Sequence, residues 1–367
     1  MLATAEYGIV SCVGKGAMVA GTTSIYSSFA TPMRDIDALM LNELSAWPWG
    51  NLAAMRRLVA AQIGRPGKRL RPLLGLAVCA SLNGRPDVAL APLGAVELYH
   101  QASLVLDDVQ DNSEVRRGVA SVRTSASTST AINVAALTRS LSYHLIHRSP
   151  LATAAEKLRM HRELDEAATR LVMGQSIDIG WHEGWYAADA YPYDQMVGWK
   201  TGALFGCAAA MGAIAASADE TVIGRAREFG VQLGELYQVV DDFLDAFGSD
   251  ELLGRPARED LREGKMSAPV VLLLRSLAAA GRAADAEQVA EQLRARHPDV
   301  ARDLVDLLES TGVAEQLRAE VVGRAEGLRR AALAIADAES GHLVGLVDLV
   351  TARVSLSDRT HSNADVP

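Results

Sequence analysis

The chain has few cysteines, few prolines and few aromatic residues, and its acidic residues outnumber its basic ones. Its three cysteines, Cys12, Cys79 and Cys207, lie far apart and form no C-x-x-C pair, which argues against a disulfide scaffold and a zinc site. The formal net charge of −9 argues against a surface built to bind nucleic acid or anionic lipid. This cysteine usage suits a reducing compartment, so we expect a cytoplasmic protein.

The N-terminal residues contain no evident targeting or membrane-spanning segment. The apolar stretch "GIVSCVGKGAMVAG" at 8–21 is interrupted by Lys15, follows no basic region and is too short to cross a bilayer. The sequence therefore predicts no transmembrane segment. We expect a flexible N-terminal extension over residues 1–31, a folded domain over 32–355 and a disordered C-terminal tail over 356–367.

The rest of the chain has the pattern of helices. Apolar residues recur every three or four positions, Ala and Leu dominate, and neither a repeat of fixed period nor a Gly/Pro/Ser-rich linker divides the sequence. An all-α, single-domain helical bundle follows from this pattern. Helices are predicted at 33–46, 51–63, 69–83, 88–112, 125–146, 152–180, 191–216, 219–247, 267–280, 284–295, 298–310, 312–337 and 340–354.

An acidic cluster follows an apolar helix in "LVLDDVQDNSEVRRG", residues 104–118. Asp107, Asp108 and Asp111 form D-D-x-x-D, and the first and last share one helical face at i, i+4. Like charges at this spacing repel, so a cation should compensate them. Taken alone, the cluster could equally be a solvated helix end.

A second copy of this cluster favours a metal site. "YQVVDDFLDAFG" at 237–248 places Asp241, Asp242 and Asp245 at the same spacing, again near the end of an apolar helix. Facing carboxylates would suit Mg²⁺, which prefers oxygen ligands and is commonly shared with substrate phosphates. The spacing therefore predicts magnesium ions and a phosphate or diphosphate substrate.

Basic residues stand where such a substrate would need them. "GRPGKRLRPLL" at 64–74 places them at a helix start, where backbone N–H groups also favour an anion. Each basic residue alone could be an ordinary surface charge, whereas together they predict an anion site. The set comprises Lys68, Arg69, Arg71, Arg116, Arg117, Lys200 and Lys265.

With these motifs in order, the sequence resembles the trans-isoprenyl diphosphate synthases, the polyprenyl synthetase family, over roughly residues 35–355. Each motif alone is weak, but seven in the same order are highly specific. They are "GKRLRP" at 67–72, "HQASLVLDDVQD" at 100–111, "RRG" at 116–118, "GQSID" at 174–178, "KTGALF" at 200–205, "YQVVDDFLD" at 237–245 and "GRPAREDLREGKMSAP" at 254–269.

The resemblance implies an isoprenoid-synthase helical bundle around a central cavity and a role for each matching residue. Several Mg²⁺ ions would be held by Asp107, Asp108, Asp111 and Asp241, with Asp245 acting through water. An allylic diphosphate would be held by Arg116, Lys200 and Lys265. Isopentenyl diphosphate would be held by Gly67, Lys68, Arg71, His100 and Arg117. Thr201 and Gln238 would lie near the reacting carbon, and Gln175 and Asp178 would line or support the cavity.

The implied reaction is a chain elongation. Metal ions and basic side chains stabilise the departing diphosphate, so the allylic C–O bond ionises, and the double bond of isopentenyl diphosphate attacks the resulting carbocation. A proton is then lost to the released diphosphate. No nucleophilic side chain is needed, which agrees with a sequence that shows no Ser-His-Asp or Cys-His arrangement.

Residues upstream of Asp107 are expected to set product length, since in this family the growing tail runs along that helix. Ala102 and Ser103, about one helical turn upstream of Asp107, are too small to block the growing tail, which argues against a ten- or fifteen-carbon product. Tyr99 lies three residues further back, about 4.5 Å along the helix axis. A C20 product is expected, C25 or longer if Tyr99 swings aside, and Tyr99 could also be an ordinary core residue.

The sequence departs from the family pattern after "RRG". Ala120 replaces a usual Pro, Arg123 a usual His, and Ala135 and Ala136 a usual Gly-Asp, while Arg255 replaces a common Lys. Two alternatives stay open: a class I terpene cyclase on the same fold, and a noncatalytic partner subunit of a prenyl synthase. The resemblance also implies a homodimer.

Overall fold

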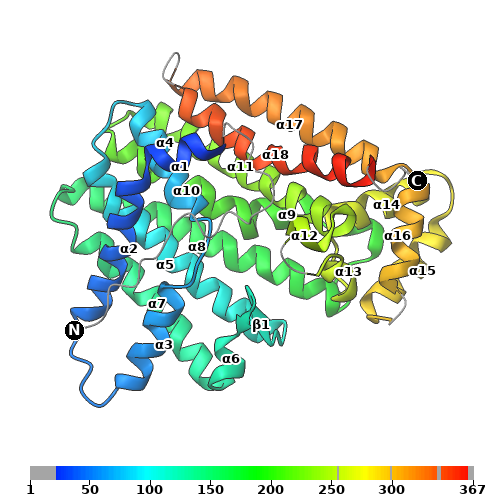
Figure 1. The fold of residues 1–367 in the computed structure, drawn as a ribbon, viewed down its shortest axis with the longest axis horizontal. Helices are drawn as coiled ribbons and strands as arrows, with labels where there is room; N and C mark the ends of the chain where they lie inside the picture. The colour runs from blue at the N-terminus through cyan, green and yellow to red at the C-terminus, as the bar shows by residue number, and fades with distance from the viewer. Residues whose placement is uncertain (1–21, 254–255, 298–299, 337–339, 363–367) are drawn as a thin grey trace. The chain divides into compact units, whose positions relative to one another are not determined.

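The fold is that of a computed structural model, which describes residues 22–253, 256–297, 300–336 and 340–362. These residues are almost entirely helical (Figure 1), which confirms the all-α prediction. Arg255, one of the departures from the family pattern, lies outside the described residues, as does Cys12.

The chain divides into two compact units, each built from two stretches of sequence. The first unit comprises the described residues up to Leu164 together with Ala208–Ile223, and the second comprises Asp165–Cys207 and the described residues from Gly224 onward. Every boundary falls inside a helix, α8 (Ala154–His182), α10 (Ala203–Ala215) or α11 (Glu220–Phe247). This explains why the sequence shows no linker.

The first unit is organised around α5 (Pro86–Gln110), which packs against α2, α4 and α7. Proline at the first helical position, together with Asp87 in the first turn, favours a helix start here. Most residues from Val88 to Val105 are buried, so this long helix forms the centre of the unit. Its other elements are α1 (Thr22–Ser28), α2 (Ala30–Ser45), α3 (Ala53–Ile63), α4 (Leu70–Ser81), β1 (Val115–Arg116), β2 (Val119–Ala120), α6 (Val122–Ser125) and α7 (Thr128–His147).

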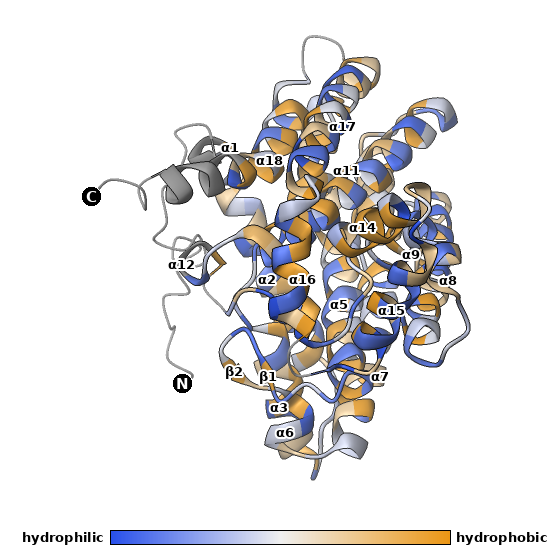
Figure 2. Cartoon of the chain, turned by 90° about the vertical axis from the view of Figure 1, so that its right-hand side faces the viewer, coloured by the Kyte–Doolittle hydropathy of each residue, from blue (hydrophilic) through white to orange (hydrophobic). Residues whose placement is uncertain are grey.

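The second unit continues from α8 to the C-terminal helices. Its helix α16 buries Val300, Leu304 and Leu308 at four-residue spacing and exposes polar residues between them, which is the pattern of an amphipathic helix. Figure 2 shows apolar and polar residues sharing α16 and α17, and α17 packs along α18. The further elements are η2 (Ala188–Ala190), α9 (Tyr193–Val197), η3 (Gly198–Gly202), α12 (Asp250–Leu253), α13 (Glu259–Arg262), α14 (Ala268–Ala279), α15 (Ala283–Arg294), α16 (Val300–Ser310), α17 (Val313–Ala336) and α18 (Gly341–Ser362).

The helix predicted over 191–216 is interrupted by a π-helical turn. This turn, η3, separates α9 from α10 and carries Lys200 and Thr201. π-Helical turns are rare and often mark functional sites.

The stretch Tyr193–Ala215 is long and apolar enough to cross a membrane by length and composition alone, but 83% of its most apolar window is buried inside the structure, as in a core helix.

The helical part of the chain is longer than predicted at both ends. Residues 22–31 form α1 and begin α2, and Ile25 and Phe29 are buried, whereas a flexible extension was expected up to residue 31. These two apolar side chains explain the difference, because their burial stabilises the added turns. At the other end α18 stays helical to Ser362, past the boundary predicted at 356.

A buried ion-pair network fixes the segment between α3 and α4. Arg69 has the left-handed backbone conformation (φ +48°), and its guanidinium lies 2.7 Å from Glu97 Oε1 and 3.2 Å from Asp37 Oδ1. It also donates to the carbonyl oxygen of Ile63 at 2.8 Å. Arg69 is therefore occupied by the protein itself, and it lies between Lys68 and Arg71 in the predicted substrate-binding motif.

Removing one partner of this network should destabilise the protein strongly. Glu97 is almost fully buried, so Glu97→Ala leaves the Arg69 guanidinium poorly compensated and should cost about 3–5 kcal/mol of unfolding free energy. Urea titration followed by circular dichroism measures this change. Arg85→Ala, which breaks an exposed pair with Asp87, is the control and should leave the urea midpoint unchanged. Equal midpoints for the two variants would contradict the prediction.

Candidate functional site

The first acidic cluster occupies the last turn of α5. The helix ends with Asn112 in the left-handed conformation (φ +54°), and the Ser113 N–H donates to the Asp108 carbonyl at 2.9 Å, as in a Schellman motif. Carboxylates at a helix C-terminus face the negative end of the helix dipole. The cluster is therefore unfavourable by itself and requires a positive partner.

Arg116 supplies that partner. Its guanidinium lies 2.7 Å from Asp107 Oδ2 and 2.6 Å from Asp108 Oδ1. A two-residue hairpin turn, Arg117 (φ +54°) and Gly118 (φ +76°), joins β1 to β2, and this pair of left-handed residues matches a type I′ turn. The "RRG" motif therefore has a structural function, because the turn places Arg116 beside both carboxylates.

The predicted isopentenyl diphosphate residues form a basic group in the same unit. Arg117 Nη1 donates to the Pro66 carbonyl at 2.6 Å, and a Cβ on Gly67 would lie 2.6 Å from that same nitrogen. Glycine at position 67 therefore lets the Arg117 guanidinium lie against the loop. Lys68 is exposed, while Arg71 and His100 are partly buried.

The charge around His100 should appear in the pH dependence of stability. Burial and the neighbouring Arg71, Arg117, Arg69 and Arg116 lower the pKa of His100 well below its usual value of 6.5. The unfolded chain then binds more protons than the folded one below about pH 6.5, so stability falls as the pH falls. The slope should reach about 1.4 kcal/mol per pH unit.

His100→Gln should remove that part of the slope. Urea unfolding at pH 7.5 and 5.5 measures it, with His147→Gln, an exposed histidine on α7, as the control. Parallel pH profiles for the wild type and His100→Gln would refute the prediction.

The second acidic cluster, near the end of α11, has a different structure. Asp242 is buried and accepts hydrogen bonds from the Tyr193 hydroxyl (2.7 Å), Gln238 Nε2 (2.8 Å) and the Ala268 N–H (2.8 Å). Burial raises the pKa of Asp242 to about 6. Asp245 is also buried and accepts from two backbone N–H groups at 3.0 and 3.3 Å. Asp241 is the most accessible of the three, with 35% of its side chain exposed and Arg353 Nη1 at 3.9 Å.

The predicted allylic diphosphate residues of the second unit pair with carboxylates outside this cluster. Lys200 Nζ lies 2.5 Å from Asp178 Oδ2, so Asp178 supports the lysine. Thr201 donates to Gln238 Oε1 at 2.9 Å, and Gln238 in turn donates to Asp242. Lys265 Nζ lies 2.5 Å from Glu263 and 3.6 Å from Asp260. Burial raises the pKa of Asp260 to about 8, and sequence reasoning did not select this residue.

The donor set suits Mg²⁺. In the first unit Asp107 and Asp111 keep exposed surface and Arg116 pairs with Asp107, and in the second unit Asp241 keeps exposed surface. Hard oxygen ligands of this kind are those that Mg²⁺ prefers. Within the described ranges, no preassembled group of three or more His, Cys, Asp or Glu ligands occurs.

The residues predicted to set chain length lie in the core of the first unit. Ala102 and Tyr99 are buried, and the Ser103 hydroxyl donates to the His100 carbonyl at 2.8 Å. Tyr99 meets the Tyr143 ring of α7 edge to face at 6.5 Å, and Tyr143 stacks on the His161 ring of α8 at 6.1 Å and 5°. Sequence reasoning missed Tyr143 and His161, since no spacing links them to Tyr99.

The departures from the family pattern have visible consequences in the first unit. Arg123 Nη2 donates to the Asn112 carbonyl at 2.5 Å, and Arg65 Nη2 donates to the Ala120 carbonyl at 2.8 Å. Arg123 therefore holds the turn that follows the first acidic cluster. Ala135 is buried on α7, and its neighbour Ala136 is exposed.

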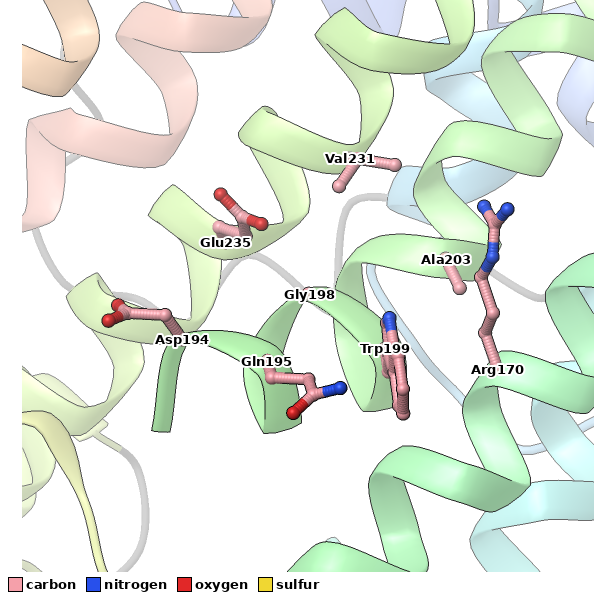
Figure 3. Close-up of a pocket in the computed structure, with 8 residues that line it drawn as sticks. All are labelled: Arg170, Asp194, Gln195, Gly198, Trp199, Ala203, Val231 and Glu235. Carbon is pink, nitrogen blue, oxygen red and sulfur yellow. The ribbon is translucent and has the colours of Figure 1, made fainter. Parts of the chain in front are cut away.

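A pocket of about 250 Å³ opens in the second unit (Figure 3). Its walls come from α8, α9, η3, α10 and α11, with the Asp194 and Glu235 carboxylates on one side and the Arg170 guanidinium on the other. Arg324 lies 3.8 Å from Asp194 and 3.9 Å from Glu235, so the acidic side chains are already balanced. None of the predicted site residues lines this pocket.

Comparison with known proteins agrees with the predicted family. The family model for polyprenyl synthetase matches residues 53–308. The geranylfarnesyl diphosphate synthase of Aeropyrum pernix is 32% identical over 87% of this chain and 99% of its own length. The geranylgeranyl diphosphate synthase of Saccharolobus solfataricus is 30% identical over 57% of this chain and 63% of its own length.

Solved structures agree on the fold. The polyprenyl synthetase of Streptomyces coelicolor A3(2) superposes with a TM-score of 0.75 at 28% identity, covering 90% of this chain and 99% of that one. The polyprenyl synthase of Caulobacter crescentus CB15 superposes with a TM-score of 0.78 at 23% identity, covering 90% and 97%. The isoprenoid-synthase fold expected from the motifs is thereby confirmed.

Proposed function

The chain belongs to the polyprenyl synthetase family and is a prenyltransferase, and we propose that it condenses isopentenyl diphosphate with an allylic diphosphate in a Mg²⁺-dependent reaction. The observation that carries this proposal is the end of α5. Two adjacent carboxylates, Asp107 and Asp108, share one arginine at the unfavourable end of a helix dipole. Such an arrangement is costly for stability alone and suits a site that binds cations and phosphates.

The side chains would act by binding and charge stabilisation. Asp107, Asp108, Asp111 and Asp241 would hold Mg²⁺, with Asp245 acting through water. When bound, Mg²⁺ would neutralise the negative charge that develops on the departing diphosphate. Arg116, Lys200 and Lys265 would donate to the same diphosphate, and Asp178 would keep Lys200 oriented.

Isopentenyl diphosphate would be held by Lys68, Arg71, Arg117 and His100, with Gly67 leaving room for the arginine. Burial and then the surrounding arginines lower the pKa of His100 and keep it neutral, so it would donate a single hydrogen bond without adding charge. The allylic C–O bond breaks, the carbon–carbon bond forms from the isopentenyl double bond, and the proton lost leaves with the diphosphate. Thr201 and Gln238 would offer oxygen atoms to the carbocation.

The product is proposed to be C20, geranylgeranyl diphosphate. Tyr99 is held by the Tyr143–His161 stack, which favours a fixed wall over a side chain that swings aside. The relatives include a geranylfarnesyl and a geranylgeranyl synthase, so a C25 product is the nearest alternative.

A cyclase is less well supported, because it would not need the second anion group formed by Lys68, Arg71, His100 and Arg117. A noncatalytic partner subunit is disfavoured because both acidic clusters are intact.

The proposal is tested by incubating the protein with Mg²⁺, isopentenyl diphosphate and C5, C10, C15 or C20 allylic diphosphates, and by reading the products by mass spectrometry before and after phosphatase treatment. Prenyl alcohols that appear only after phosphatase support elongation. Hydrocarbons formed without isopentenyl diphosphate would make the protein a cyclase.

A cytoplasmic homodimer is proposed for the whole protein. The first unit exposes the apolar side chains Ile132, Leu151 and Leu158, which a second copy could cover. Light scattering of the purified protein gives the mass directly, and a mass near the 39.0 kDa of one chain would refute the dimer.

A further inference from the structure

Lys265 lies on a loop whose backbone is held by buried groups on both sides of the lysine. Before it, the N–H groups of Glu259 and Asp260 donate to the carboxylate of Asp245 at 3.3 and 3.0 Å. After it, the N–H of Ala268 donates to Asp242 Oδ2 at 2.8 Å. The second acidic cluster therefore anchors this loop, and the Lys265 N–H donates to the Asp260 carbonyl at 2.9 Å, which leaves the carbonyl of the Gly264–Lys265 peptide to be held by another group.

Trp181 makes that contact. Its side chain is completely buried, and its indole Nε1–H, from α8, donates to the carbonyl of Gly264 at 3.0 Å. Gly264 has a left-handed backbone (φ +74°), and a Cβ there would run into the carbonyl of Leu293. The peptide that leads into Lys265 is thus held at both polar atoms, at its N–H by the Asp260 carbonyl and at its carbonyl by the indole, and position 264 has no room for a side chain.

Arg294, the last residue of α15, fixes the indole in turn. Its guanidinium carbon lies 4.2 Å from the centre of the Trp181 ring, a cation–π contact. Its Nε donates to the Trp181 carbonyl and its Nη2 to the Tyr186 carbonyl, both at 3.2 Å. A residue at the end of α15, outside both acidic clusters, therefore packs on the ring that holds Gly264.

We infer that Trp181 and Arg294 are positioning residues for Lys265, acting through the Gly264 carbonyl. This inference rests on the proposed function, in which Lys265 binds the allylic diphosphate. A lysine side chain has four flexible bonds, so its ammonium reaches a substrate reproducibly only if its backbone is fixed. Neither residue belongs to a sequence motif of the site.

Trp181→Phe is the direct test, because it keeps an aromatic ring and deletes the N–H donor. We expect KM for the allylic diphosphate to rise about fivefold to tenfold, the effect of one lost hydrogen bond, with KM for isopentenyl diphosphate unchanged. Arg294→Gln, at a partly exposed position, should act in the same direction and serves if Trp181→Phe does not fold. Tyr191→Phe is the matched control. Its ring lies 5.8 Å from that of Trp181, and its hydroxyl has no hydrogen-bond partner among the described residues.

A double-mutant cycle with Lys265→Ala separates positioning from general damage. If Trp181 acts through Lys265, Trp181→Phe should change kcat/KM less than twofold in the Lys265→Ala background. The same loss in both backgrounds, or no loss in either, would overturn the inference.

Titration calorimetry of pyrophosphate into each protein of the cycle, with Mg²⁺ present, measures the same coupling between Trp181 and Lys265 as a binding affinity, without turnover. A wild type that binds pyrophosphate but forms no product would refute the proposed function, and the affinities of the four proteins would then decide whether Trp181 acts through Lys265. A wild type that binds no pyrophosphate would overturn both.

Discussion

Asp107→Ala and Asp241→Ala are each expected to lower turnover by about 10²- to 10³-fold while the protein stays folded. Asp107 faces Arg116 at the end of α5, and Asp241 is the most accessible carboxylate of the second cluster. Each variant removes oxygen atoms that are proposed to bind Mg²⁺ and, in the first case, the partner of an arginine that would bind the diphosphate. Steady-state rates with saturating Mg²⁺ and both substrates measure the loss, and chelation of Mg²⁺ from the wild type should give a comparable one.

The matched control for Asp107→Ala is Asp87→Ala, which removes an exposed aspartate from the first turn of the same helix. It should keep near wild-type turnover, and circular dichroism should be unchanged in all three variants. Near-normal turnover of both Asp107→Ala and Asp241→Ala would rule out the metal–diphosphate assignment.

Tyr99→Ala is expected to lengthen the product by at least one C5 unit. The substitution removes the ring that Tyr143 and His161 hold in place, and Ala102 and Ser103 above it are already small. Product alcohols after phosphatase treatment, resolved by mass, should shift from C20 to C25 or longer, with total turnover reduced less than tenfold.

Tyr99→Phe should preserve the wild-type product, because the ring remains. Tyr143→Ala should lengthen the product in part, because Tyr99 then loses its edge-to-face partner on α7. An unchanged product in Tyr99→Ala would mean that Tyr99 is an ordinary core residue and that the end of the tail is determined elsewhere.

Most of the fold was predictable from the sequence because it depends on local periodicity. The helices predicted at 51–63, 219–247 and 312–337 agree with α3, α11 and α17 to within two residues at each end. The family was predictable from motif order. The β1–β2 hairpin was not, because two-residue strands carry no alternation and only the left-handed pair Arg117 and Gly118 indicates the turn.

The chemistry of the site was only partly predictable. The spacing of the second cluster treats Asp241, Asp242 and Asp245 alike, yet the fold buries two of them against backbone N–H groups contributed by residues 259–268. Which carboxylate stays accessible depends on tertiary packing, and no local pattern encodes it. The contacts of Trp181 and Tyr143 also depend on tertiary packing, because their partners lie 83 and 44 residues away in sequence.

The π-helical turn at Gly198–Gly202 makes the spacing of its helix intolerant of insertions and deletions. Each residue added to or removed from an α-helix rotates everything beyond it by about 100°. Deleting one residue from this turn would restore α-helical phase, but it would turn either Lys200 away from Asp178 or Tyr193 away from Asp242. A change of length here redirects one of these two side chains, so chains that keep this chemistry should keep the number of residues between Tyr193 and Lys200.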